Sequence, residues 1–372
     1  MTDLALLPFT ASLAEYHSFA ERARAALDAG DEAVAWRFKW EHPRFRGKHV
    51  SEVRAARLDL EDAKLLVAQT HAFDSWDDLA AFTDSVMRDR AVLRFETAVD
   101  AIVDGEGHTL EALLREDPSL PSARSVRRHH ATLLHYIGAN GVEGWRQRTP
   151  PNAVAIARLL LDAGSDPNAL ADMYDAQCTT LSMLVSSAPP ADAGLQAALA
   201  ELLIERGASL EAPGSRWNAA VLTALAFGYL DTARALAAHD GPIRDLAVAA
   251  GLGQLGETAR LLPSADDESQ RAALVLACLH GHVRVARLLL DAGVDPSQYN
   301  PDGFHSHSTP LHQAVWSNRG EIVRLLVERG ARLDLRDTVY DGTPLDWAVY
   351  DKRTEIAEYL QHRIQPSTEV VG

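Results

Sequence analysis

The sequence predicts an all-α solenoid, a chain of helix–turn–helix units in which each unit stacks on the next. The segment ARLLLDAGVDP at Ala286–Pro296 repeats ARLLLDAGSDP at Ala157–Pro167 with a single change. A second motif, TPL, begins at Thr309 and again at Thr343. Repetition at a period of about 33 residues is typical of repeat architectures, in which the core grows along one axis and each unit packs on its neighbours.

The unit that starts at Thr309 shows how one repeat is built. Apolar residues recur at helical spacing in TPLHQAVW and again in EIVRLLV, which predicts two helices. Thr309 is placed to cap the first helix, with Pro310 in its first turn, where a missing N–H costs nothing. Gly330 is expected to end the second helix, because glycine can take the left-handed conformation that a C-cap needs.

These residues resemble the ankyrin repeat. The resemblance is carried by TPLH at 309–312, LLVERGA at 325–331, GH at 281–282 and the two LLLDAG runs. It implies hairpin fingers between helix pairs, and a concave face of fingers and inner helices that binds other molecules. It also implies that His312 and His135, in the TPLH histidine position, bond to finger backbone. Asn318 takes the usual glycine position between two helices, which is tolerable because asparagine accepts a positive φ.

The repeats divide the chain into three parts. We expect residues 1–88 to form a helical capping region, residues 89–364 an array of about eight units, and residues 365–372 a flexible tail. The capping region resembles the helical segment that precedes ankyrin units in a group of bacterial proteins, with Ser75 as the N-cap of its last helix. Excess residues at 142–153 and 186–194 indicate insertions between the two helices of neighbouring units.

The net charge and the cysteine content limit which kinds of partner and which cellular location we expect. The chain has 36 basic and 52 acidic residues and a net charge of −16, a field that repels nucleic acid and anionic membranes and favours a basic or neutral partner. The opening residues lack the pattern of a signal peptide, and no apolar run is long enough to span a bilayer. Cys178 and Cys278 lack metal-site spacing and are interpreted as reduced thiols, which predicts a cytoplasmic protein.

Three irregular fingers supply acidic, aromatic and imidazole side chains, the mixture that binding sites favour. The predicted binding groove comprises Asp172, Tyr174, Trp217, Tyr299, Phe304, Trp316 and Trp347. His305 and His307 could both face one side of an extended finger, but no third ligand is set by spacing, so neither a metal nor a cofactor is predicted.

A cluster of arginines raises a separate hypothesis of an anion site. Its members lie in or before the first insertion: Arg127, Arg128, Arg146 and Arg148. The alternative, which we favour, is that Trp145 pins the insertion to the helices while the arginines balance an acidic protein.

Two functions remain open at this stage. The ankyrin resemblance favours a non-enzymatic module that binds a protein, peptide or small ligand. The alternative is an enzyme with acid–base chemistry in a pocket closed by the fingers, which would use Asp346, Asp341, His305, His307 and Tyr340. Asp346 replaces the TPLH histidine in the last unit. An enclosed pocket of about 300–1,000 Å³ would favour the enzyme, and an open groove the binding module.

Overall fold

The computed structural model describes residues 7–138, 148–212 and 219–364. The contacts divide the chain into two compact units, Met1–Trp217 and Asn218–Gly372, and each is described by itself. In the described part of the chain, no helix is long and apolar enough to cross a lipid bilayer. The expected tail at 365–372 lies outside the described residues, as do Trp145, Arg146 and Trp217.

Short helices form the start of the first unit. Over residues 7–88 they are α1 (Leu13–Asp28), α2 (Glu32–Glu41), the 3₁₀ helix η1 (Pro43–Phe45), α3 (Val50–Ala55), α4 (Leu60–Thr70) and α5 (Trp76–Arg88). They bury a shared core around Tyr16, Phe19 and Phe38. Ser75 accepts the Asp78 N–H at 3.1 Å, so the predicted N-cap of α5 is confirmed.

Three helix pairs occupy the rest of the first unit's described residues. The elements are α6 (Arg90–Asp104), α7 (Gly107–Glu116), η2 (Leu120–Ser122), α8 (His135–Gly138), α9 (Ala153–Asp162), β1 (Ala171–Met173), β2 (Ala176–Cys178), α10 (Thr180–Leu184), α11 (Ala188–Asp192) and α12 (Gln196–Glu205). The strands form an antiparallel hairpin, with a turn at Tyr174 and Asp175, both at positive φ. The extra residues between α10 and α12 form the short helix α11, and Gln196 ties its start to α10 by donating to the Leu184 and Ser187 carbonyls.

A buried arginine joins the opening helices to the first helix pairs. Arg127 is only 5% exposed, and its guanidinium lies 4.3 Å from the Phe9 ring centroid and 4.4 Å from that of Phe73. Its Nη2 atom donates to the His71 carbonyl at 2.6 Å and to the Ala72 carbonyl at 3.2 Å. Aromatic faces and carbonyl oxygens together compensate the charge for its lost hydration.

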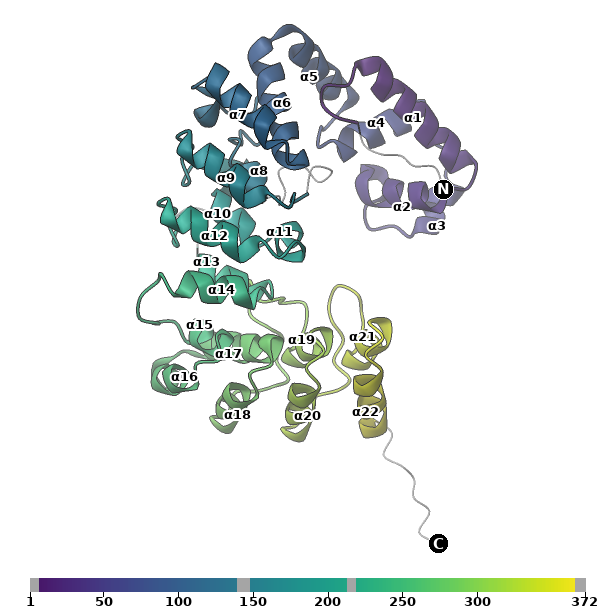
Figure 1. Ribbon diagram of the computed structural model, residues 1–372. Coiled ribbons are helices and arrows are strands. Elements are labelled where there is room, and N and C mark those ends of the chain that lie inside the picture. The colour runs from purple at the N-terminus through teal and green to yellow at the C-terminus, as the bar shows by residue number, and fades with distance from the viewer. Residues whose placement is uncertain (1–6, 139–147, 213–218, 365–372) are drawn as a thin grey trace. The chain divides into compact units, whose positions relative to one another are not determined.

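The second unit is a more regular stack of helix pairs. Its described elements are α13 (Ala220–Ala226), α14 (Leu230–Ala237), α15 (Leu246–Gly251), α16 (Leu255–Leu261), η4 (Leu262–Ser264), α17 (Asp267–His280), α18 (Val283–Asp291), α19 (Pro310–Trp316), α20 (Gly320–Glu328), α21 (Pro344–Tyr350) and α22 (Thr354–Ile364). Figure 1 shows α18, α20 and α22 side by side, with α17, α19 and α21 forming a second row.

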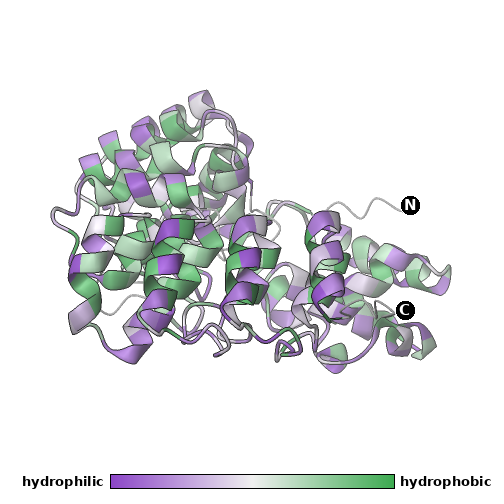
Figure 2. Ribbon diagram, turned by 90° about the horizontal axis from the view of Figure 1, so that it is seen from below, coloured by the Kyte–Doolittle hydropathy of each residue, from purple (hydrophilic) through white to green (hydrophobic). Residues whose placement is uncertain are grey.

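Each helix pair buries its apolar face against the pairs before and after it. Leu311, Ala314 and Val315 of α19 and Ile322 and Leu326 of α20 belong to one core that runs through the second unit. Hydrophobic and hydrophilic residues alternate along the individual helices, as Figure 2 shows. This amphipathic pattern is why no single pair could be stable alone. Cys178 of the first unit and Cys278 of the second are both buried, and neither forms a disulfide among the described residues.

One hydrogen-bonded device links a repeat to the next. The Nδ1 atom of His312 accepts the Thr309 N–H at 3.3 Å, which leaves Nε2 to donate to the Gly342 carbonyl at 3.1 Å. His135 does the same with the Cys178 carbonyl at 3.2 Å. In both cases the acceptor precedes the threonine that starts the next helix pair. The expected structural role of these two histidines is confirmed.

The turns between paired helices use left-handed backbone, as predicted. Asn318 has φ +54° between α19 and α20, and Gly330 has φ +84° at the end of α20. Thr309 forms a capping box with His312, and Pro310 lies in the first turn of α19. These features place the fingers before α19 and α21 next to each other, where the Thr338 N–H donates to the His307 carbonyl at 2.8 Å.

Candidate functional site

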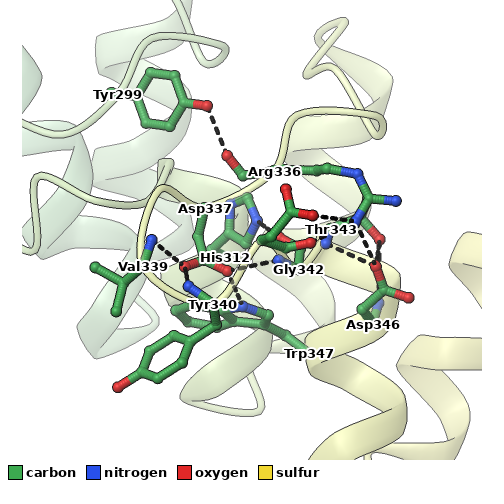
Figure 3. Close-up of polar contacts among 11 residues, drawn as sticks. Tyr299, His312, Arg336, Asp337, Val339, Tyr340, Gly342, Thr343, Asp346 and Trp347 are labelled. Atoms are coloured by element: carbon green, nitrogen blue, oxygen red, sulfur yellow. Dashed lines mark hydrogen bonds and ion pairs between the residues drawn. The ribbon is translucent and has the colours of Figure 1, made fainter. Parts of the chain in front are cut away.

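A buried carboxylate organises the finger between α20 and α21. Asp337 is 2% exposed and accepts the N–H groups of Val339, Tyr340 and Gly342 at 2.6–3.0 Å. Its Oδ2 atom also accepts the indole N–H of Trp347 at 2.9 Å. Burial by itself raises the pKa of Asp337, but these hydrogen bonds outweigh it and lower the pKa below its usual value. The finger is therefore closed around a carboxylate whose ionised form these hydrogen bonds stabilise (Figure 3).

Asp337 also sets the position of the Trp347 ring at the start of α21. The indole packs on three other rings, edge-to-face against His312 at 5.0 Å and against Trp316 at 6.1 Å, and tilted against His307 at 6.0 Å between centroids. Because the indole N–H is already hydrogen-bonded inside the finger, the exposed part of the half-buried Trp347 ring presents only apolar surface to the cavity.

These rings form one wall of a cavity of about 600 Å³. The lining residues come from two fingers and two inner helices, and they are His305, His307, Gln313, Trp316, Tyr340, Gly342, Asp346, Trp347, Tyr350 and Asp351. The cavity is open to solvent, since Trp316 is 54%, Tyr340 76% and Tyr350 84% exposed. The volume of the cavity lies in the range of small-molecule binding sites, but its exposed walls make it an open groove and not an enclosed pocket.

Asp346 caps a helix in this site. Its Oδ2 atom accepts the Thr343 N–H at 2.9 Å and the Thr343 hydroxyl at 2.8 Å, and the Thr343 hydroxyl oxygen accepts the Asp346 N–H. These bonds lower the pKa of Asp346, with a further contribution from Arg336, whose guanidinium lies 3.9 Å away. The hypothesis of Asp346 as a general acid or base requires a desolvated carboxyl group whose pKa is shifted towards neutral pH, whereas these contacts lower its pKa.

The two finger histidines lie at the rim of the cavity with separate environments. His305 has φ +59°, and its Nε2 atom bonds to the Ala226 carbonyl at 2.9 Å, so it ties the finger to α13. His307 faces the aromatic cluster; burial lowers its pKa, the neighbouring His305 lowers it further, and Asp337 opposes the shift. Among the described residues, no group of three or more His, Cys, Asp or Glu side chains is arranged to hold a metal ion.

Comparisons with known proteins identify the family of the repeats. The family described as "Ankyrin repeats (3 copies)" matches residues 246–337 and 308–369. The bovine protein "Cyclin-dependent kinase 4 inhibitor B" is 31% identical over 121 residues, which are 32% of this chain and 89% of that protein. The chain belongs to the ankyrin-repeat family.

Longer relatives share only their ankyrin region with this chain. The mouse "Inactive serine/threonine-protein kinase TEX14" is 35% identical over 94 residues, 24% of this chain and 6% of its own length. Mouse "Ankyrin repeat and SAM domain-containing protein 6" is 33% identical over 101 residues, 26% of this chain and 11% of its own length. The chain thus spans a small part of these relatives. The matched proteins described here are from mammals, so the expected bacterial origin stays a prediction.

Three predicted residues of the second unit lie outside the cavity lining: the groove residues Tyr299 and Phe304 and the catalytic candidate Asp341. The Tyr299 hydroxyl donates to the Arg336 carbonyl at 2.6 Å and so links neighbouring fingers, as Figure 3 shows. Phe304 is half-buried in the same finger as His305. Asp341 is exposed, with its Oδ2 atom 3.7 Å from the Arg336 guanidinium. Tyr299 and Asp341 therefore support the fingers.

Asp172 and Tyr174 belong to the ankyrin hairpin of the first unit. Asp172 pairs with His130 at 2.8 Å and with Gln177, and these hydrogen bonds lower its pKa. Tyr174 lies at the hairpin turn and is partly exposed. The two form no part of the cavity between α19 and α21, and Trp217 lies outside the described residues.

The hypothesis of an anion site, which the sequence analysis did not favour, is not supported by the arginines that the structure describes. Arg127 is enclosed by phenylalanine rings and carbonyl oxygens, as above. Arg128 pairs with Asp74 at 2.8 Å, and Arg148 with Asp104 at 2.7 Å. Neighbours in sequence thus contact three different places, and Arg146 is outside the described residues.

Four lining residues lie outside the predicted set of site residues: Gln313, Gly342, Tyr350 and Asp351. Gln313 precedes Trp316 by three positions, and Asp351 follows Trp347 by four. Residues three and four apart share a helix face, so extending each tryptophan by this spacing would have found both.

Proposed function

We propose that the second unit binds a segment of a partner protein in the open cavity between α19 and α21. Ankyrin repeats are typical of protein-binding modules, and the name of the bovine relative describes an inhibitor of a protein kinase. The chain's net charge of −16 supports a basic or neutral partner.

The observation that carries this proposal is the set of exposed aromatic side chains gathered in the groove. Trp316, Tyr340 and Tyr350 are each more than half exposed yet face one cavity. Tryptophan and tyrosine dominate the energetics of protein interfaces because they bury much apolar area at a small entropic cost. Leaving them exposed is unfavourable unless a partner covers them.

The groove is also organised before any partner arrives. The Asp337 carboxylate orients Trp347, and the Thr338–His307 bond joins the two fingers. A preformed site loses less conformational entropy on binding, so more of the contact energy appears as affinity.

The experiment is a selection of peptides from a random displayed library on the full chain, followed by calorimetry of the selected peptides. Replacing Trp316→Ala or Tyr350→Ala should weaken binding by about tenfold or more, since central aromatic anchors contribute at least this much. Trp40→Ala is the matched control, because Trp40 is 65% exposed on α2 of the first unit. Selected peptides that bind both groove variants as tightly as the unchanged chain would contradict the proposal.

We also propose that residues 1–88 cover the first ankyrin pair, as the terminal units of a repeat array must. The enclosure of Arg127 by Phe9 and Phe73 supports this role. A cytoplasmic location remains a prediction from the two reduced cysteines.

A further inference from the structure

We infer that the cavity between α19 and α21 takes a cationic side chain, a lysine or arginine of the bound segment. The inference rests on the proposed function and adds the chemistry of the residue that the cavity recognises. Three features of the cavity support it: its aromatic walls, its two lining carboxylates, and a buried carboxylate oxygen atom without a hydrogen-bond partner among the described residues.

The walls present electron-rich ring faces at steep angles to one another. Trp316 and Trp347 lie 6.1 Å apart between centroids with an interplanar angle of 71°, and Tyr340 and Tyr350 extend the lining. A cation within about 6 Å of such a ring centroid is attracted by the negative face of the ring. Tryptophan is the most favourable ring for this contact, and here two of them line one space.

The charged groups that line the cavity are acidic. Asp346 and Asp351 are among the lining residues, and the described lining includes neither lysine nor arginine. The Oδ2 atom of Asp351 is buried and has no hydrogen-bond partner among the described residues. A buried carboxylate oxygen that lacks a donor is unfavourable, and a guanidinium or ammonium group would supply one.

Two nearby arginines, Arg336 and Arg353, hydrogen-bond to backbone carbonyls, while the buried Nε atom of Arg353 has no partner among the described residues. Arg336 donates to the Asp341 carbonyl and lies 3.7 Å from the Asp341 carboxylate and 3.9 Å from that of Asp346. Arg353 donates from Nη2 to the Trp316 carbonyl at 3.2 Å. Asp346 is thus partly neutralised, whereas the described residues supply no hydrogen-bond donor to the Oδ2 atom of Asp351.

His307 does not oppose a cation at neutral pH. Burial lowers the pKa of this imidazole, and His305 lowers it further, so the ring is neutral and adds to the aromatic wall. An apolar guest would fill the same space but would leave the Asp351 oxygen unpaired. An anionic guest would meet two carboxylates.

The experiment titrates the full chain with three small probes and follows the indole N–H resonances of Trp316 and Trp347 by NMR. The probes are the N-acetyl methylamides of arginine, lysine and norleucine, the last being a neutral analogue of similar length. Trp316→Phe and Trp347→Phe assign the two resonances. The two cationic probes should shift both resonances, and the shifts should saturate as the probe concentration rises. The norleucine probe should bind at least about fivefold more weakly, as expected for loss of a cation–ring contact.

A charge variant tests the carboxylate. Asp351→Asn should weaken binding of the cations about fivefold and leave norleucine unaffected. Glu321→Gln, the same change at an exposed residue of α20, is the matched control and should have no effect. Norleucine binding as well as lysine, or cations that leave both indoles unmoved, would overturn the inference. The first comparison uses the unchanged chain, so it does not depend on the folding of a variant.

The outcomes separate the inference from the proposed function. Peptides whose binding depends on Trp316 but that contain no lysine or arginine would support the proposed function and overturn the cationic site. Small cations that bind at the indoles while no selected peptide depends on the groove would support the cationic site and contradict the protein-binding role.

Discussion

The α8–α10 region of the first unit and the α19–α21 region of the second share one pattern of hydrogen bonds between repeats, but only the second region contains the cavity described above. In each, a histidine bonds to its capping threonine and to the carbonyl that precedes the next repeat, as His135 does with Cys178 and His312 with Gly342. In each, adjacent fingers share a backbone bond, from Asp172 to His129 or from Thr338 to His307.

The two regions differ in the side chains that their fingers carry. In the first, polar groups pair with each other, as Asp172 does with His130 and Gln177. In the second, Tyr340 and His307 join Trp316 and Trp347 around an open cavity. Paired polar groups satisfy each other, whereas ring faces stay available to a ligand. The comparison teaches that the side chains on the fingers, more than the repeat scaffold, determine where a cavity opens.

The largest expected effect is a loss of stability in acid that both units share. Burial lowers the pKa of His135 and of His280 to about 4 from 6.5, although hydrogen bonds to the Cys178 and Leu225 carbonyls oppose the shift. The unfolded chain therefore binds protons first, and stability falls as the pH drops from 6.5 to about 4. Each histidine should contribute about 3 kcal/mol to this loss.

Urea unfolding at a series of pH values measures the effect, and hydrogen exchange in α8 and α17 assigns it to each unit. His280→Gln keeps a donor for the Leu225 carbonyl but removes the titration, so it should flatten the pH dependence in the second unit alone. An unchanged slope in α17 of that variant would show that other groups cause the acid sensitivity.

The next largest effect is the loss of stability on replacing His135 or His312 by alanine, which should differ between the two residues. His135→Ala should destabilise the first unit by about 3 kcal/mol, because it leaves the Thr132 N–H and the Cys178 carbonyl unpaired in a dry core. His312→Ala should cost the second unit less, about 2 kcal/mol, since Trp347 covers it at the edge of an open cavity that water can enter. Urea unfolding followed by circular dichroism gives both values, and the reverse order would contradict the comparison.

The smallest effect concerns the last repeat, where Asp346 occupies the position of these histidines. Asp346→Ala removes a capping box but no bond to a following repeat, so we expect a loss of about 1 kcal/mol. Asp346→Asn keeps an acceptor oxygen and serves as the control, with a change of only a few tenths of a kcal/mol. A loss as large as that of His312→Ala would indicate a role for Asp346 beyond capping, and thermal unfolding of the two variants distinguishes these cases.

Features of short range could be predicted from the sequence. Ser75 as an N-cap, Asn318 and Gly330 as left-handed residues, and the structural role of His312 all depend on neighbours a few positions away or on the repeat itself. Such features can be predicted because the side chains at those positions determine the local backbone geometry.

Part of the candidate site could also be predicted, because the repeat sets which helix and which finger each residue occupies. Trp316, Tyr340 and Trp347 lie on the inner helices and a finger, and they line the same cavity. What they surround could not be deduced, since the openness of the groove and the unpaired oxygen of Asp351 depend on packing across two repeats.

By itself, then, the sequence determined the all-α repeat, the caps and turns, and the fingers that carry aromatic residues, because each depends on periodicity or nearest neighbours. The tertiary structure alone decided the partners of charged side chains. Arg127 reaches the His71 carbonyl far back in the chain, and Asp346 is a cap whose carboxylate is stabilised. The physical reason is that the free energy of a charge depends on what surrounds it in space, and sequence spacing does not specify these surroundings.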